Sequence, residues 1–409
     1  MIQNQIIEFA SNNSEIIVEA LTKGIATAVG KTFSEKTLKL LGFSGGKIFD
    51  EANNLTEQAK HFFFGISKKY IENYVKRHGT MKVLGMGEAI RLESIYTKVN
   101  FRPQTISNYG SIADIEQIFR QRECEDQEKR LALDVAKEKQ YLMVLGHPGS
   151  GKTTFLRKVG LEALKGKKGE YNRNHLCIPV FLELRDKELL DNGKVNLLKA
   201  IADEFNNCGL PEYEKCTEEL LQQGKLLIIL DGLDEVPSEH LSAMTREIRN
   251  LLDKYSDNRF IASCRIAAYR NFDSFRRFCD VSIADFDDQQ VEIFIQKWFE
   301  SHDQVEWGQK CWQDLSNDSY KGTKELTKTP LLLTLICILY RKTGQFPLNR
   351  TSLYEKTLRV LLEEWDASKQ IARTRVYESL DTKRKELLLA QVAYDNFVDD
   401  QYLRQFWNK

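Results

Sequence analysis

A glycine-rich turn between an apolar run and a helix-like segment constrains the fold of this chain more than any other feature. The apolar run covers residues 141–145 and the helix-like segment covers residues 155–165. The turn consists of Gly146, His147, Pro148, Gly149, Ser150, Gly151, Lys152, Thr153 and Thr154. A strand, a glycine-rich turn and a helix, in that order, form the context that a phosphate-binding loop requires. The sequence therefore predicts such a loop at residues 146–154.

The chemistry of the turn fits a bound phosphate. Glycines allow backbone N–H groups to turn inward around an anion, and a helix N-terminus adds partial positive charge. We expect Lys152 to reach the β- and γ-phosphates as a point charge, and the Thr153 hydroxyl to ligate Mg²⁺. The alternative is a chance glycine loop without a ligand, and a second motif bears on that choice.

The second motif is the segment 225–235, Lys-Leu-Leu-Ile-Ile-Leu-Asp-Gly-Leu-Asp-Glu. Its five consecutive apolar residues predict a central strand buried on both faces. At its end, Asp231 is placed to hold Mg²⁺ directly or through water. Glu235 is placed to orient or deprotonate an attacking water, and Asp234 is able to share that role. A buried strand followed by a solvated acidic turn is the alternative, but both motifs together predict a nucleoside triphosphate site.

A third candidate, Arg265, ends the β-prone run 259–265. If this strand lies between the loop strand and the acidic strand, its guanidinium lies beside the γ-phosphate and senses it. A structural salt bridge is the equal alternative. Pro179, in the run 175–184, predicts an edge strand because proline cannot complete a central ladder.

Length and composition limit the remaining possibilities. A chain of 409 residues predicts two to four domains. Lys+Arg and Asp+Glu both number 59, so no polyanionic partner is demanded, and we see no clear nucleic-acid site. No secretory signal is visible, the longest apolar run (330–340) is too short for a transmembrane segment, and the eight cysteines show no zinc spacing. We expect a cytoplasmic protein.

The hydrophobic periodicity predicts an α/β P-loop NTPase core, a parallel sheet with helices on both faces, between helical regions. The predicted domains are an N-terminal helical domain for signalling or oligomerisation (1–95), a nucleotide-binding domain (96–285), a helical domain (286–345) and an incomplete winged-helix-like domain (346–409). In the last two regions we expect helices at 291–299, 331–340, 352–365 and 382–397.

Taken together, the motifs resemble the NACHT module of signal-transducing (STAND-class) ATPases, the class that includes animal NLR immune receptors. The chain is most similar to bacterial NACHT proteins, many of which act in defence against phage. The matching parts are the loop 146–154, the motif 226–235, Arg265, the helix 288–299 and the segment 329–336. A lead-in at 74–96 also matches, and the resemblance covers residues 70–365.

The resemblance implies roles for single residues. Lys152 and Thr153 bind phosphate and Mg²⁺, Asp231 binds the metal, and Asp234 and Glu235 serve hydrolysis. Arg265 senses the γ-phosphate, and Pro330 packs near the adenine. The family further implies a closed state with ADP and an open state with ATP that forms a homo-oligomer in response to an unknown trigger, such as a phage component.

The chain departs from the family in two ways. Animal relatives place a histidine of the winged-helix region against ADP, whereas the last histidine here, His302, precedes that region. Family members also continue into a C-terminal sensor, whereas this sequence ends at residue 409. We expect either an unusually short protein or a piece that lacks its sensor.

Three rival functions share some of these features. An AAA+ motor uses the same phosphate chemistry, but no pore-loop aromatic motif is evident. A GTPase is disfavoured because the guanine-reading motif Asn-Lys-x-Asp is missing, so we expect ATP. The non-enzymatic rival is a scaffold that keeps its nucleotide as a structural ligand.

Overall fold

The computed structural model describes residues 15–32, 49, 55–83, 88–103, 129–165, 169–171, 177–186, 190–191, 194–210, 213–269, 275–347, 350–368 and 382–398. The chain forms two compact units. The first comprises Met1–Met81 and Ala89–Gln290, and the second comprises Lys82–Glu88 and Val291–Lys409.

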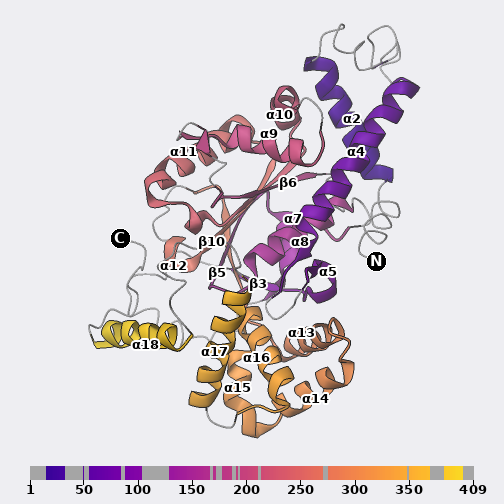
Figure 1. The fold of residues 1–409 in the computed structure, drawn as a ribbon. Helices are drawn as coiled ribbons and strands as arrows, with labels where there is room; N and C mark the ends of the chain where they lie inside the picture. Colours follow the sequence, from indigo (N-terminus) through magenta and orange to yellow (C-terminus); the bar gives the residue numbers. More distant parts are fainter. Residues whose placement is uncertain are drawn as a thin grey trace. The chain divides into compact units, whose positions relative to one another are not determined.

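The first unit is built on a mostly parallel seven-stranded sheet (Figure 1). In spatial order its strands are β4 (Arg130–Leu131), β3 (Asn100–Pro103), β11 (Cys279–Ile283), β5 (Tyr141–Gly146), β10 (Arg259–Arg265), β9 (Leu226–Asp231) and β6 (Ile178–Glu183). The strands from β11 to β6 run parallel, whereas β3 and β4 are added antiparallel at one edge. The predicted α/β P-loop core with a parallel sheet is confirmed.

The two strands that carry the main motifs lie where their sequences predict. All six residues of β9 are buried, which confirms a central strand covered on both faces. Strand β10 pairs with β5 on one side and β9 on the other, so the Arg265 strand does separate the two motif strands. Strand β6 lies at the sheet edge opposite β4, as expected from Pro179.

Helices cover the sheet on both sides. In Figure 1, α8 lies on one side of the strands and α9 and α11 lie on the other. The helices of this region are α5 (Leu92–Ile95), α7 (Ala132–Glu138), α8 (Lys152–Leu164), α9 (Leu197–Asn207), α10 (Tyr213–Gln222), α11 (Ser238–Lys254) and α12 (Ile266–Tyr269). We did not predict α10, whose polar sequence buries Cys216, Leu220 and Leu221 along a narrow stripe.

The N-terminal helices pack on this core. Helix α4 (Glu57–His78) begins after its N-cap Thr56 and ends at Gly79, and α2 (Glu15–Thr32) contacts both α4 and α10. On the β6 edge, the Tyr70 hydroxyl donates to the Pro179 carbonyl at 2.7 Å. Tyr74 comes so close to Gly160 of α8 that a Cβ at Gly160 would clash with its hydroxyl. Helix α4 therefore protects a sheet edge that would otherwise be open. The sequence pattern of residues 33–41 predicts a further short helix, and that segment lies outside the described residues.

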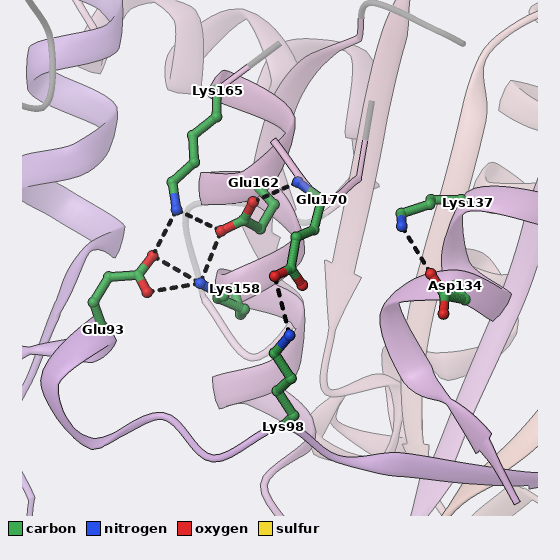
Figure 2. Close-up of polar contacts among 8 residues, drawn as sticks. All are labelled: Glu93, Lys98, Asp134, Lys137, Lys158, Glu162, Lys165 and Glu170. Carbon is green, nitrogen blue, oxygen red and sulfur yellow. Dashed lines mark hydrogen bonds and ion pairs between the residues drawn. The ribbon is translucent and has the colours of Figure 1, made fainter. Parts of the chain in front are cut away.

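A compact group of charged side chains joins α5 to α8 (Figure 2). We name Glu93, Lys158, Glu162 and Lys165 the buried ion cluster. Lys158 Nζ donates to Glu93 Oε2 at 2.7 Å and to Glu162 Oε1 at 2.8 Å, and Lys165 Nζ contacts both carboxylates as well. Because Lys158 and Glu162 are almost fully buried, these contacts replace the water that both charges lose.

The second unit is helical. Its helices are α13 (Asp288–Glu300), α14 (Val305–Leu315), α15 (Lys321–Leu326), α16 (Pro330–Thr343), α17 (Arg350–Ser368) and α18 (Thr382–Val398). Trp298, Phe299 and Tyr340 form much of its core, and the Tyr340 hydroxyl donates to Asp314. The four helices expected here are present, whereas α14 and α15 were not predicted. The domain boundaries at 95, 285 and 345 stay a prediction.

Candidate nucleotide-binding site

The phosphate-binding loop connects the end of β5 to the start of α8. Gly149 (φ 75°) and Gly151 (φ 92°) adopt left-handed backbone conformations that favour glycine. A Cβ at Gly146 would collide with the Ser150 hydroxyl, so any other residue there would require the Ser150 side chain to move. Helix α8 begins at Lys152 directly after this turn, and its N-terminus faces the loop.

Among the described residues, the loop holds a buried cation without a carboxylate partner and a buried hydroxyl without a hydrogen-bond partner. Lys152 Nζ donates to the carbonyls of Gly146 (3.0 Å) and His147 (3.2 Å), and among the described residues no carboxylate pairs with it. Burial lowers the pKa of Lys152, although nearby Asp234 and Asp231 oppose this effect. The buried Ser150 hydroxyl has no hydrogen-bond partner in the described part of the chain. A buried cation and an unsatisfied hydroxyl in a tight loop fit an anionic ligand.

Asp231 and Thr153 are brought together, as the sequence predicts for a metal site. Asp231 is buried, and burial raises its pKa against the opposing hydrogen bonds from Ser263 and Thr153. Within the described residues, no group of three or more His, Cys, Asp or Glu side chains is arranged to hold a metal. Because protein-bound Mg²⁺ commonly combines one carboxylate with substrate phosphates and water, this sparse set of donors fits a nucleotide-bound Mg²⁺.

Ser263, two residues before Arg265, was missed from the sequence. Its hydroxyl donates to Asp231 Oδ1 at 2.6 Å and accepts the backbone N–H of Gly232 at 2.9 Å. It thereby fixes one oxygen of the Asp231 carboxylate, which also accepts a hydrogen bond from Thr153. The only signal in the sequence was a small polar residue inside an otherwise apolar strand.

Asp234 and Arg265 form a close pair. The Arg265 backbone N–H donates to Asp234 Oδ1 at 2.8 Å, and its Nε lies 2.9 Å from Asp234 Oδ2. The Asp234 side chain is 7% exposed, whereas that of Arg265 is 47% exposed. Arg265 therefore forms a salt bridge while its side chain remains about half exposed. Its role as a phosphate sensor stays a prediction.

Glu235 lies at the open side of the site. Its side chain is 39% exposed, and its pKa is raised first by partial burial and then by Asp234 and Asp231, against Arg185 and Arg265. Arg185, another residue missed from the sequence, follows β6 and lies 3.7 Å from Glu235 Oε2. Since Asp234 is fully engaged with Arg265, Glu235 is the better placed carboxylate for contact with water.

A comparison with protein families finds a match over the same part of the chain. The model of the NACHT domain matches residues 140–302, from β5 to the end of α13. This segment is similar to a NACHT domain. It identifies a nucleotide-binding P-loop NTPase module, and it contains every predicted site residue except Pro330, which begins α16 in the second unit.

Comparisons with whole proteins add little to the NACHT match. No curated protein matches the chain. Among solved structures, domain III of the replication initiation protein DnaA of Thermotoga maritima is similar at 16% identity and a TM-score of 0.30, over 57% of this chain and 88% of that one. A point variant of RuvB of Thermotoga maritima is similar at 11% identity and a TM-score of 0.30, over 74% of this chain and 90% of that one. PCH-2 of C. elegans is similar at 14% identity and a TM-score of 0.30, over 65% and 74% of the two chains.

The helices were also compared with the length and hydropathy of a membrane span. Across the described residues, every helix is too short or too polar to span a membrane.

Proposed function

We propose that this chain is a signalling switch that binds ATP and hydrolyses it slowly, is closed with ADP, and self-associates with ATP. One observation carries the proposal. Strand β10 lies between β5 and β9, so the ends of three adjacent parallel strands bring Lys152, Asp231 and Arg265 to one edge of the sheet. This is the edge at which ligands of open α/β sheets bind.

The residues divide the work between binding and hydrolysis. The loop N–H groups and Lys152 hold the phosphates, while Thr153 and Asp231 hold Mg²⁺. When bound, Mg²⁺ neutralises phosphate charge. Glu235 orients or deprotonates the attacking water, and Asp234 is able to share that role. Arg265 contacts the γ-phosphate, and Pro330 packs near the adenine.

Slow turnover is favoured by the contacts among the hydrolytic residues themselves. Arg265 is tied to Asp234 by two contacts, and Glu235 lies between Arg185 and Arg265. The γ-phosphate has to compete with these ion pairs for Arg265, so its presence or absence changes the arrangement of the pairs. A change in local charge that biases two conformations is the physical basis of such switches.

Turnover and assembly of Glu235→Gln test this proposal against its rivals. We expect the parent to hydrolyse ATP slowly and Glu235→Gln to hydrolyse it at least about tenfold more slowly. By light scattering, Glu235→Gln should form a defined multimer with Mg-ATP and stay smaller with Mg-ADP. Glu239→Gln, an exposed neighbour on α11, is the matched control and should behave as the parent.

The outcomes separate the alternatives. Equal turnover in parent and Glu235→Gln would indicate a scaffold with a structural nucleotide. Fast turnover without a nucleotide-dependent change in mass would favour a motor. Preference for GTP over ATP in competition binding would overturn the nucleotide assignment.

The likeness of the motif set to bacterial NACHT proteins supports immunity to phage as the biological role. The test is a comparison of plaque numbers on cells that express the parent or Lys152→Ala. Protection by the parent alone supports the role, whereas equal plaque numbers across a broad phage panel contradict it. The trigger, a phage component in this proposal, is then sought by recovering resistant phage.

A further inference from the structure

Both oxygens of the Glu235 carboxylate face guanidinium groups. Arg185 Nη1 lies 3.7 Å from Glu235 Oε2, and Arg265 Nη2 lies 4.0 Å from Glu235 Oε1. Arg265 has a second partner in Asp234, as described above. Arg185 comes from a different part of the sheet, the chain directly after edge strand β6.

Arg185 is held in place by an anchor. Its Nη2 donates to Glu183 Oε2 at 2.6 Å, and the other oxygen of Glu183 accepts from Arg157 Nη2 of helix α8 at 3.0 Å. Burial alone would raise the pKa of Glu183, but Arg185 and Arg157 outweigh it and lower the pKa. Glu183 also pairs in register with Asp231, which fixes the anchor relative to the metal ligand. A series of side-chain contacts thus links the phosphate-loop helix to the proposed base: Arg157 to Glu183, Glu183 to Arg185, and Arg185 to Glu235.

A general base needs a free lone pair directed at the water that it deprotonates. A guanidinium beside the carboxylate competes for that lone pair and favours the charged, less basic form. We propose that Arg185 is a positioning residue that restrains Glu235 and slows hydrolysis. This inference rests on the proposed function, because it assigns Arg185 a role in the same reaction.

The opposite role, in which Arg185 holds Glu235 in its productive position, predicts the opposite sign. If Arg185 restrains the base, its removal raises kcat. If Arg185 orients the base, its removal lowers kcat. General damage to the fold also lowers kcat, so a rise is a result that a merely structural role does not produce.

The test measures steady-state ATP hydrolysis by the full chain with Arg185→Gln, Arg185→Lys and Arg249→Gln. An ion pair this exposed contributes only modestly, so we expect kcat of Arg185→Gln to rise about threefold with KM changed less than about twofold. Arg185→Lys, which keeps the charge, should return kcat toward the parental value. Arg249→Gln removes an exposed arginine of α11 that is distant in sequence from the site residues, and it should leave kcat and KM unchanged.

Each other outcome decides the proposal. A fall in kcat, an unchanged kcat, or a rise that Arg185→Lys shares in full overturns the restraint by Arg185. If Arg185→Gln does not fold, Glu183→Gln replaces it, since loss of the anchor should also raise kcat. If the parent itself shows no turnover, the proposed function fails, and that result is distinct from a failure of the restraint.

Discussion

Helix α8 carries two groups of charged residues that differ in how their charges are balanced. At its start, Lys152 faces Asp231, Asp234 and Arg265 in the nucleotide site. Further along, Lys158, Glu162 and Lys165 belong to the buried ion cluster (Figure 2). In the cluster each charge directly contacts an opposite charge. In the site, Lys152 is held by carbonyls, and Asp231 is held by hydroxyls.

The pKa shifts follow this difference. Burial would raise the pKa of Glu93 and Glu162, but Lys158 and Lys165 outweigh it, and both values are lowered. At the site burial prevails, so the pKa of Lys152 is lowered and that of Asp231 is raised. The charged forms of Glu93 and Glu162 are stabilised in the cluster, whereas Lys152 and Asp231 have no direct ion pair among the described residues of the site. Buried charges therefore stabilise the fold in the buried ion cluster, whereas in the candidate nucleotide site they are arranged for a ligand.

The largest effect in this comparison is expected for Lys152→Ala. Two charge-assisted bonds to phosphate would be lost, so we expect nucleotide binding to weaken by about 4 kcal/mol, roughly a thousandfold. The free energy of unfolding without nucleotide should not fall, because the variant removes a poorly compensated cation. Titration with a fluorescent ADP measures the affinity for nucleotide, and denaturant unfolding measures the stability. Near-parental affinity would show that the loop does not bind phosphate.

Lys158→Met, on the same helix, should behave in the reverse way. Removing one partner of a buried pair leaves a charge without its counterion, so we expect a loss of about 3 kcal/mol in the free energy of unfolding. The loss should shrink as acid protonates Glu93 and Glu162, since carboxyls with a lowered pKa contribute stability that disappears as the pH falls. Urea unfolding at neutral and acidic pH measures both. A variant of parental stability would argue against the structural role of the cluster.

Ser263→Ala sharpens the comparison within the site. Loss of the bond to Asp231 should weaken Mg²⁺-dependent nucleotide binding about tenfold, because partners of metal ligands tune metal affinity by such factors. Affinity measured in EDTA should stay unchanged. The control is Ser242→Ala, which changes an exposed residue of α11. Equal losses with and without Mg²⁺ would indicate that Ser263 supports the fold rather than the metal ligand.

The smallest effect is expected for Lys98→Met. Lys98 pairs with Glu170 at 3.1 Å next to the buried ion cluster, but both side chains are at least half exposed. Surface pairs contribute little, so the free energy of unfolding should change by less than about 0.5 kcal/mol in urea. A loss as large as that of Lys158→Met would show that burial does not explain the difference between the two pairs.

Much of the fold could be predicted from local patterns. The continuous apolar residues of β9 and the strand, glycine turn and helix around Lys152 each lie within one short segment, where spacing alone limits the structure. Helix α10 was missed because three buried apolar side chains among charged ones give a weak periodic signal. The composition of residues 95–101 is β-prone, but Ile95 is buried on the short helix α5 and β3 starts only at Asn100.

The sequence by itself determined which residues are candidates for the nucleotide site, since Lys152, Thr153, Asp231 and Glu235 belong to two motifs with fixed internal spacing. Only the tertiary structure decided which charges compensate each other. Ser263 meets Asp231 across 32 residues of sequence, and Lys158 meets Glu93 across 65. No local pattern encodes such contacts, because they depend on strand order and on how helices pack against the sheet. For the same reason Arg185 became a candidate only when β6 was placed beside β9.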